Sequence, residues 1–189
     1  WVYSNCYEVE LLLNGRSLGR RSLPRFDHFE LAVPYEAGEL VARGYRKGRV
    51  AAENRVVTAG SPARMMLAAD RPAIRADGED VSVITTRILD GSGKLVPTAG
   101  NRVEFRVSGP GRIIGVGNGD PSCLERDKAN WRSAFNGLCL LLVQSAGEPG
   151  EIHVEAASEG LSESGMMSIQ AVRVVAPGPR REEELHEQV

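Results

Sequence analysis

The stretch Gly109-Pro-Gly-Arg-Ile-Ile-Gly-Val-Gly-Asn-Gly-Asp-Pro121 decides the fold of this 189-residue chain. Its apolar centre, Ile113 to Val116, is bracketed by glycines and prolines. These residues favour turns, because glycine tolerates positive φ and proline cannot donate a hydrogen bond to a neighbouring strand. A short apolar run between such turns is typical of a buried strand. The stretch therefore predicts a short buried strand, followed by a polar excursion over residues 118–136.

Outward from this stretch, the second half of the chain has the period of β-strands. Residues 102–107 and 151–156 alternate strictly between apolar and charged side chains. Residues 81–89 are apolar on both faces, as expected for a central strand. About seven strands in roughly 110 residues, with turn signals between them, are typical of an immunoglobulin-like sandwich.

The first half predicts a smaller β unit. Val9, Leu11 and Leu13 alternate with polar neighbours, and Asn14-Gly15 is a strong hairpin signal. Further strands are expected over residues 29–33, 40–45 and 50–57. We therefore predict an all-β chain with two immunoglobulin-like β-sandwich domains in tandem. The predicted ranges are 1–59 and 60–175, with a linker at 59–62 and a disordered tail over 176–189.

Composition excludes several classes of partner. The net charge is −2, and basic residues are scattered among acidic ones, so no nucleic-acid partner is expected. No apolar run approaches the length of a membrane span, so no membrane partner is expected either. The sequence reads as a piece of a longer protein. The compartment of that protein, periplasm and secretion included, is left open.

The residues that could carry chemistry do not form a recognisable active site. The three histidines lie far apart in sequence, and the acidic turn at Asp77, Glu79 and Asp80 does not fit an EF-hand. A glycosidase needs one carboxylic acid in apolar surroundings that raise its pKa, and the acidic residues here lie in turns or on polar faces. We predict no catalytic residue, no metal and no cofactor. The cysteines read as buried or incidental thiols, with a Cys123–Cys139 bridge as the alternative.

The polar excursion holds the candidate carbohydrate-binding residues. Trp131 and Phe135, four residues apart, would share one face of a helical turn and form an aromatic platform for a sugar ring. Asn118 and Asp120 would add polar contacts. The alternative is that both rings close one end of the sandwich and that both polar side chains satisfy turn backbone. Trp1 and Tyr3, outside the excursion, are either core residues or an interface with another domain.

Several short motifs occur in order along the chain. In the first half they are Tyr3-Ser-Asn-Cys6, Val9-Glu-Leu11 and Leu13-Asn-Gly-Arg-Ser-Leu-Gly19. In the second half they are Leu67-Ala-Ala-Asp-Arg71, Ala76-Asp-Gly78, Gly115-Val-Gly-Asn-Gly-Asp-Pro121, Arg132-Ser-Ala-Phe-Asn-Gly-Leu138 and Glu159-Gly-Leu161. Together these motifs resemble the β domains that follow the catalytic barrel in bacterial glycoside hydrolase family 2 enzymes, and the resemblance covers nearly the whole chain except its tail.

This resemblance implies the C-terminal region of a β-galactosidase-like hydrolase that cleaves terminal β-galactosides. In that family a jelly-roll domain, an immunoglobulin-like domain and a TIM barrel precede these modules and would be their partners. The barrel carries two catalytic glutamates, and neither is in this sequence, so no catalytic residue is carried over. The expected role is non-catalytic support of the barrel. The alternative is a carbohydrate-binding module that contacts glycan through residues 118–136. The family also includes β-glucuronidases and β-mannosidases.

Overall fold

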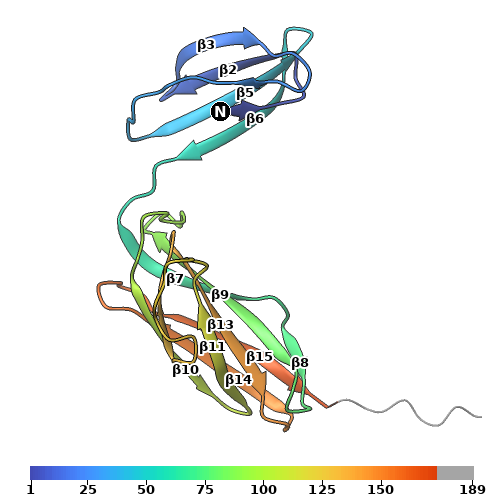
Figure 1. Ribbon diagram of the computed structural model, residues 1–189, viewed down its shortest axis with the longest axis vertical. Coiled ribbons are helices and arrows are strands. Elements are labelled where there is room, and N and C mark those ends of the chain that lie inside the picture. Colours follow the sequence, from blue (N-terminus) through green and yellow to red (C-terminus); the bar gives the residue numbers. More distant parts are fainter. Residues whose placement is uncertain (174–189) are drawn as a thin grey trace, which may run out of the picture. The chain divides into compact units, whose positions relative to one another are not determined.

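The computed structural model describes residues 1–173, and these residues form strands, turns and loops without a helix. The prediction of an all-β chain is thus confirmed for the described part. Two compact units divide the chain, the first from Trp1 to Ala59 and the second from Gly60 onward (Figure 1). The predicted disordered tail at 176–189 lies outside the described residues. No helix able to span a bilayer occurs in residues 1–173.

The first unit has two sheets around a small core. The four-stranded sheet has the order β3 (Arg16–Ser22), β2 (Glu8–Leu13), β5 (Glu39–Arg46) and β6 (Arg49–Val57), and the second sheet pairs β1 (Val2–Tyr3) with β4 (His28–Phe29). Val9 and Leu11 of β2 point toward Leu23 and Phe29, where all four side chains are buried together. The strand predicted over 29–33 is wrong beyond Phe29. Residues after Phe29 still pack against this core, but their backbone joins no ladder.

The second unit is a sandwich of a four-stranded and a five-stranded sheet (Figure 1). The first sheet has the order β11 (Gly111–Gly117), β13 (Leu138–Ser145), β9 (Val81–Asp90) and β7 (Pro62–Ala69). The second has the order β12 (Trp131–Ser133), β10 (Arg102–Ser108), β14 (Gly150–Ala157), β15 (Gly165–Val172) and β8 (Ala73–Arg75). All pairs are antiparallel except β15 with β8. The core contains Ile84, Ile88, Leu141 and Val143 from one sheet and Val103, Phe105, Ile152, Val154 and Ile169 from the other.

The glycine-rich stretch forms β11, which is longer than predicted and lies at the edge of its sheet. Ile113 and Ile114 are half-buried, Val116 is buried, and a bulge at Ile114 shifts the register against β13. Gly109, in the turn before β11, has φ +87°, and a Cβ there would lie 2.2 Å from the carbonyl oxygen of Glu151. Only glycine fits this turn. The strand is therefore a half-buried edge strand, and the prediction of a short buried one is wrong in extent and in burial.

The predicted linker begins on a buried carboxylate of the second unit. Oδ2 of Asp90 accepts a hydrogen bond from the Gly60 amide at 2.8 Å. Oδ1 accepts from the Ser92 amide, the Ser92 hydroxyl and the Lys94 amide. The Gly60 amide and the other donors hold the pKa of Asp90 far below its usual value. This carboxylate therefore stabilises the turn after β9 and fixes Gly60 to the second unit.

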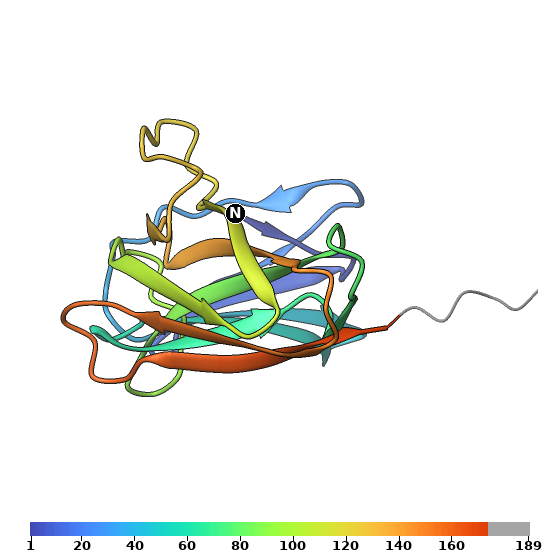
Figure 2. The same ribbon diagram turned by 90° about the horizontal axis from the view of Figure 1, so that it is seen from below.

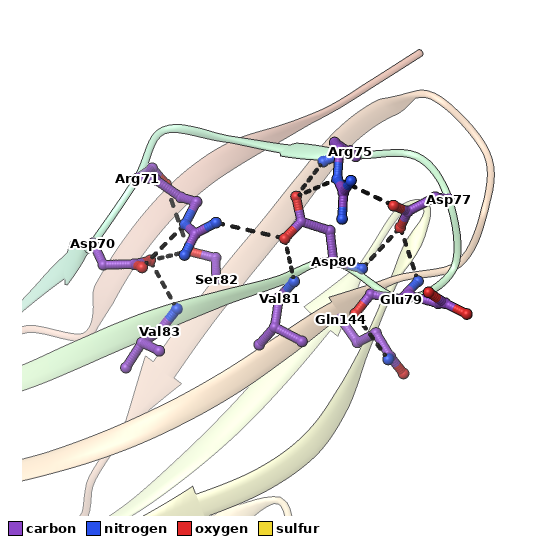
Figure 3. Close-up of polar contacts among 10 residues, drawn as sticks. All are labelled: Asp70, Arg71, Arg75, Asp77, Glu79, Asp80, Val81, Ser82, Val83 and Gln144. Carbon is purple, nitrogen blue, oxygen red and sulfur yellow. Dashed lines mark hydrogen bonds and ion pairs between the residues drawn. The ribbon is translucent and has the colours of Figure 1, made fainter. Parts of the chain in front are cut away.

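Alternating aspartate and arginine side chains connect the β7–β8 and β8–β9 turns (Figure 3). Arg71 contacts Asp70 at 3.1 Å and Asp80 at 3.5 Å, and Arg75 contacts Asp77 at 3.2 Å and Asp80 at 3.5 Å. Backbone amides also donate to these carboxylates, that of Asp80 to Asp77 and that of Arg75 to Asp80. The acidic turn therefore directs its oxygens at donors of the chain. Nowhere in residues 1–173 do three or more potential metal ligands form a metal-binding group.

Replacement of Phe105 by alanine should lower the free energy of unfolding by about 3–5 kcal/mol, because the ring is buried between the two sheets and its loss leaves a cavity. Urea denaturation measures this loss. Alanine at the neighbouring exposed Arg106 is the matched control and should have little effect. A loss below about 1 kcal/mol at Phe105 would contradict the inward orientation of this side chain.

Acid should weaken the network of Figure 3. Hydrogen bonds from the Asp80 amide to Asp77, and from the Arg75 amide to Asp80, hold both pKa values below the usual range. A lowered folded-state pKa contributes stability above the unfolded pKa of about 3.9, and this contribution disappears as pH falls through the folded pKa. Urea denaturation between pH 7 and 2.5 should show stability falling below about pH 4. The double variant Asp77→Asn, Asp80→Asn should have a smaller acid slope, and an unchanged slope would contradict this assignment.

Candidate functional site

The polar excursion, residues 118–136, leaves the second unit after β11 and returns through β12 to the start of β13. Figure 2 shows it as the gold loop that stands out from the strands. Within it Leu124 is 98% exposed. The excursion has no regular ladder until β12, so its polar backbone depends on scattered backbone contacts and on side-chain partners.

The guanidinium of Arg132 holds the excursion together. Arg132 lies on β12 and is only 2% exposed, although it is charged. One nitrogen, Nη2, donates to Asp127 Oδ1 at 2.6 Å and to the Val116 carbonyl at 3.0 Å. The other, Nη1, lies 3.1 Å from Cys123 Sγ and 3.4 Å from the Glu125 carbonyl. These contacts join both ends of the loop to β11, which makes Arg132 the centre of the excursion.

Glu125 fixes the opposite side of β12. Its carboxylate accepts from the Ser133 amide at 3.0 Å and from the Ser133 hydroxyl at 2.6 Å. Burial opposes the charge of Glu125, but the two bonds from Ser133 and the field of Arg132 outweigh it and lower the pKa of this carboxyl. Glu125 is therefore an ionised structural group.

Asn118 and Asp120 serve the backbone of the excursion. The side-chain nitrogen Nδ2 of Asn118 donates to the Ser133 carbonyl at 2.9 Å. Its side-chain oxygen Oδ1 accepts from the backbone amide of Asp120 at 3.0 Å. Asp120 accepts from the hydroxyl and the amide of Ser122, and these bonds lower the pKa of its carboxyl. The structure thus brings Asn118 next to β12. It leaves both side chains with partners inside the loop.

Trp131 is half-buried on β12 under an arginine. The guanidinium carbon of Arg102 lies 3.9 Å from the centre of its ring, and Glu104 is its cross-strand partner. Arg102 and Glu104 also line an open groove of about 500 Å³ with residues 157–159. One face of the ring is therefore covered by a cation, and two of its neighbours on β10 line a groove that contains charges of both signs.

Phe135 lies just beyond β12, and the helical turn predicted for Trp131 and Phe135 is wrong. Arg132 and Ala134 are buried, whereas Trp131 is half-buried and Phe135 is 39% exposed, so the side chains alternate as along an extended segment. Phe135 and Leu138 exchange backbone hydrogen bonds across a two-residue turn in which Asn136 and Gly137 both have positive φ. The segment is extended rather than helical because this hairpin turn connects β12 to β13.

The two cysteines near the excursion are free thiols in the structure. Cys139 is buried in β13, and burial raises the pKa of its thiol to about 11. Such a thiol stays protonated at neutral pH and is inert. Cys123 contacts Arg132, so the alternative of a bridge between these cysteines is not the arrangement seen.

The carboxyl groups whose pKa is clearly shifted are poorly suited to acid catalysis. A glycosidase acid needs a raised pKa, so that it is protonated near neutral pH. Within residues 1–173, every carboxyl group whose pKa departs clearly from its usual value is lowered, and hydrogen bonds or arginines are responsible. These groups stabilise turns and strand pairs in the ionised form.

Two residues central to this region were missed in the sequence, Arg132 and Arg102. Arg132 appeared in the sequence only as the first residue of the motif Arg132-Ser-Ala-Phe-Asn-Gly-Leu138, which gave no sign of its burial or its partners. Arg102 was interpreted only as the polar partner in the alternation of β10. Its cross-strand position relative to Trp131 depends on the pairing of β10 with β12.

Comparison with known proteins matches each unit to a domain family. Residues 65–167 match the model of the glycoside hydrolase family 2 C-terminal domain 5, and residues 1–52 match a domain family of unknown function. A β-galactosidase of Bacteroides ovatus, BoGH2A, is 42% identical over 87% of this chain and 20% of its own length. A β-glucuronidase of Formosa agariphila is 28% identical over 86% of this chain and 17% of its own length.

The fold agrees with the same family. A crystal structure of a glycosyl hydrolase family 2 member from Bacteroides cellulosilyticus superimposes with a TM-score of 0.86 at 37% identity, over 90% of this chain and 22% of that one. The chain therefore spans only about a fifth of these relatives. It belongs to the glycoside hydrolase family 2 C-terminal domains.

Proposed function

We propose that this chain is the non-catalytic C-terminal region of a β-galactosidase-type family 2 enzyme, where it supports the catalytic barrel that hydrolyses terminal β-galactosides. The observation that carries the proposal is the match of its second unit to a C-terminal domain family whose relatives are several times longer. The 42% identity to a β-galactosidase favours that activity for the parent protein over glucuronidase activity. The remaining domains of the parent are then the partners of this region.

The electrostatics of the described residues support this role. Hydrolysis by two carboxyl groups needs one of them protonated, and the shifted carboxyl groups here are held ionised by donors of the chain. The excursion likewise directs Asn118, Asp120 and Glu125 at its own backbone and hydroxyl groups. A rigid accessory region has this kind of internally satisfied polar structure.

We expect the purified 189-residue chain to release no nitrophenol from nitrophenyl β-galactoside, β-glucuronide or β-mannoside, whereas the full-length parent should cleave the galactoside. Deletion of the 189 residues from the parent should lower its melting temperature, because the exposed partner surface loses its cover. An assay of the chain alone would also detect contaminating glycosidase activity. A parent with both catalytic glutamates replaced is the control for that contamination. Turnover by the chain itself, or a deletion without effect on melting, would contradict the proposal.

A second candidate function is glycan binding through the excursion. Trp131 beside the groove of Arg102 and Glu104 favours it, since a sugar ring stacks on an aromatic face while charged groups bind its hydroxyls. Arg102 would have to leave the ring, or the sugar would have to use the opposite face. Phe135 supplies a second exposed ring next to the same strand.

Calorimetric titration with β-galactosides and plant oligosaccharides tests this candidate. Binding through the excursion should weaken in Trp131→Ala and stay unchanged in Leu124→Ala, the matched control, because Leu124 is an exposed apolar residue of the same loop. Stacking on one ring is worth roughly 1–1.5 kcal/mol, so a loss of about tenfold in affinity is expected. If no heat of binding is measured at millimolar sugar, the glycan-binding function is contradicted and the structural role is left.

A further inference from the structure

Exposed aromatic side chains are concentrated in the first unit. Trp1, Tyr3, Tyr7, Phe26 and Tyr35 are all largely exposed, and Phe26 is 95% exposed. In the described part of the second unit, only Phe135 joins them. Large rings in water add nothing to the stability of the unit that carries them, and their clustering is typical of an interaction surface.

Two of these rings lie on the outer side of the β1–β4 sheet. Trp1 and Tyr3 are two residues apart, so their side chains lie on the same face of the strand. Both rings pack against His28 of β4, with centroid distances of 5.5 Å to each. Trp1 and Tyr3 are therefore surface residues, and the alternative that they are core is wrong.

An open groove of about 1060 Å³ continues from this face. It is lined by residues 3–7 and residues 22–27, which include Tyr3, Tyr7 and Phe26. Arg25 and Asp27 also line it, and the guanidinium of Arg25 lies 4.8 Å from the ring centre of Phe26. No acidic side chain in residues 1–173 forms an ion pair with Arg25, so its charge is available to a partner.

The backbone of Phe26 is strained, and nothing within the unit explains the strain. Phe26 has φ +70°, a region where bulky residues are rare. It occupies the third position of a turn closed by a hydrogen bond from the Asp27 amide to the Pro24 carbonyl, and turns with positive φ at this position normally carry glycine. A strained residue that is also 95% exposed indicates a role outside its own unit.

The opposite face of the first unit, by contrast, carries paired charges, which suit contact with water. Glu8 and Glu10 lie on the side of β2 away from Val9 and Leu11. On that side, ion pairs join Arg20 to Glu8 at 2.6 Å, and the neighbouring strands β5 and β6 pair through Arg43, Glu53, Arg55 and Glu39. The first unit therefore has one charge-paired face and one aromatic face.

We propose that Trp1, Tyr3, Tyr7, Arg25 and Phe26 form a docking surface, here called the aromatic surface, for another domain of the same longer polypeptide. The inference rests on the proposed function, since it assumes the multidomain parent. Tryptophan, tyrosine and arginine dominate the energetics of protein interfaces. The relatives supply the occupant, because about four fifths of their length lies outside the region matched here.

Hydroxyl-radical labelling of the full-length parent, read by mass spectrometry, tests the aromatic surface directly. Trp1, Tyr7 and Phe26 should be oxidised at least about fivefold more slowly in the folded parent than in the urea-unfolded parent, because docking covers them. Met166, an exposed side chain on β15, is the internal reference and should change little. Rings labelled as fast as in urea would overturn the proposal. Rings protected only after oligosaccharide is added would also overturn it and would assign the surface to glycan.

The variant Phe26→Gly separates docking from folding. Glycine relieves the positive φ, so the first unit itself should not be weakened, whereas the parent should lose the docked ring and melt about 2–4 °C lower. Leu124→Gly is the matched control, since Leu124 is a loop residue of similar exposure, and it should leave melting nearly unchanged. A melting temperature of the parent that stays the same or rises in Phe26→Gly would overturn the proposal.

Deletion of the whole region distinguishes this inference from the proposed function. If deletion lowers the melting temperature of the parent but Phe26→Gly does not and the rings stay reactive, the region supports the enzyme through another surface. If deletion has no effect, the supporting role itself is wrong, and the docking inference fails with it.

Discussion

A polar group that folding removes from water must find a hydrogen-bond partner in the chain, because an unpaired one costs about 1–3 kcal/mol. In the strands of both units the backbone ladders meet this requirement. In the irregular segments, charged side chains meet it. The Asp90 carboxylate accepts hydrogen bonds from the Gly60 amide and from the turn after β9. The Arg132 guanidinium donates to acceptors on β11 and in the excursion. These contacts connect the long loop of this sandwich to the neighbouring strands.

The same requirement explains why the carboxyl groups that hold the turns are kept in their ionised form. Donors that satisfy a carboxylate also favour its charged form, so its pKa falls. Asp77, Asp80, Asp90 and Asp120 all follow this rule. A glycosidase acid needs the reverse environment, apolar and poor in donors. The polar groups of these turns therefore stabilise the fold, which agrees with the match of this region to a C-terminal domain of family 2.

The two faces of the first unit expose different kinds of side chain. A domain of about 60 residues buries only about 60% of the surface that its unfolded chain exposes, so its stability by itself is marginal. Its four-stranded sheet turns paired charges outward, whereas the β1–β4 side exposes rings and carries strain at Phe26. Packing of that side against a further domain would complete a core that the unit does not complete alone.

Much of the fold could be predicted because burial imposes the period of a strand on the sequence. The alternation placed Val9, Phe105 and Val154 inside, and Asn14-Gly15 marked a hairpin between β2 and β3. The three-residue strand β8 was missed, because so short a segment shows no period, and β12 was mistaken for part of a helical turn. Of the candidate site, only the position of the excursion was predictable. The roles of its side chains depend on neighbours from other strands.

By itself, therefore, the sequence determined the all-β class, the inward side chains of the long strands and several of the turns, because these follow from the order of neighbouring residues. Tertiary structure alone decided that Arg132 is buried, that Arg102 covers Trp131 and that Trp1 and Tyr3 are exposed. The acceptors of Arg132 come from β11 and from three positions of the excursion, and Arg102 reaches Trp131 across a strand pair. Contacts between segments distant in sequence leave no periodic pattern, so they appear only when the sheets are assembled.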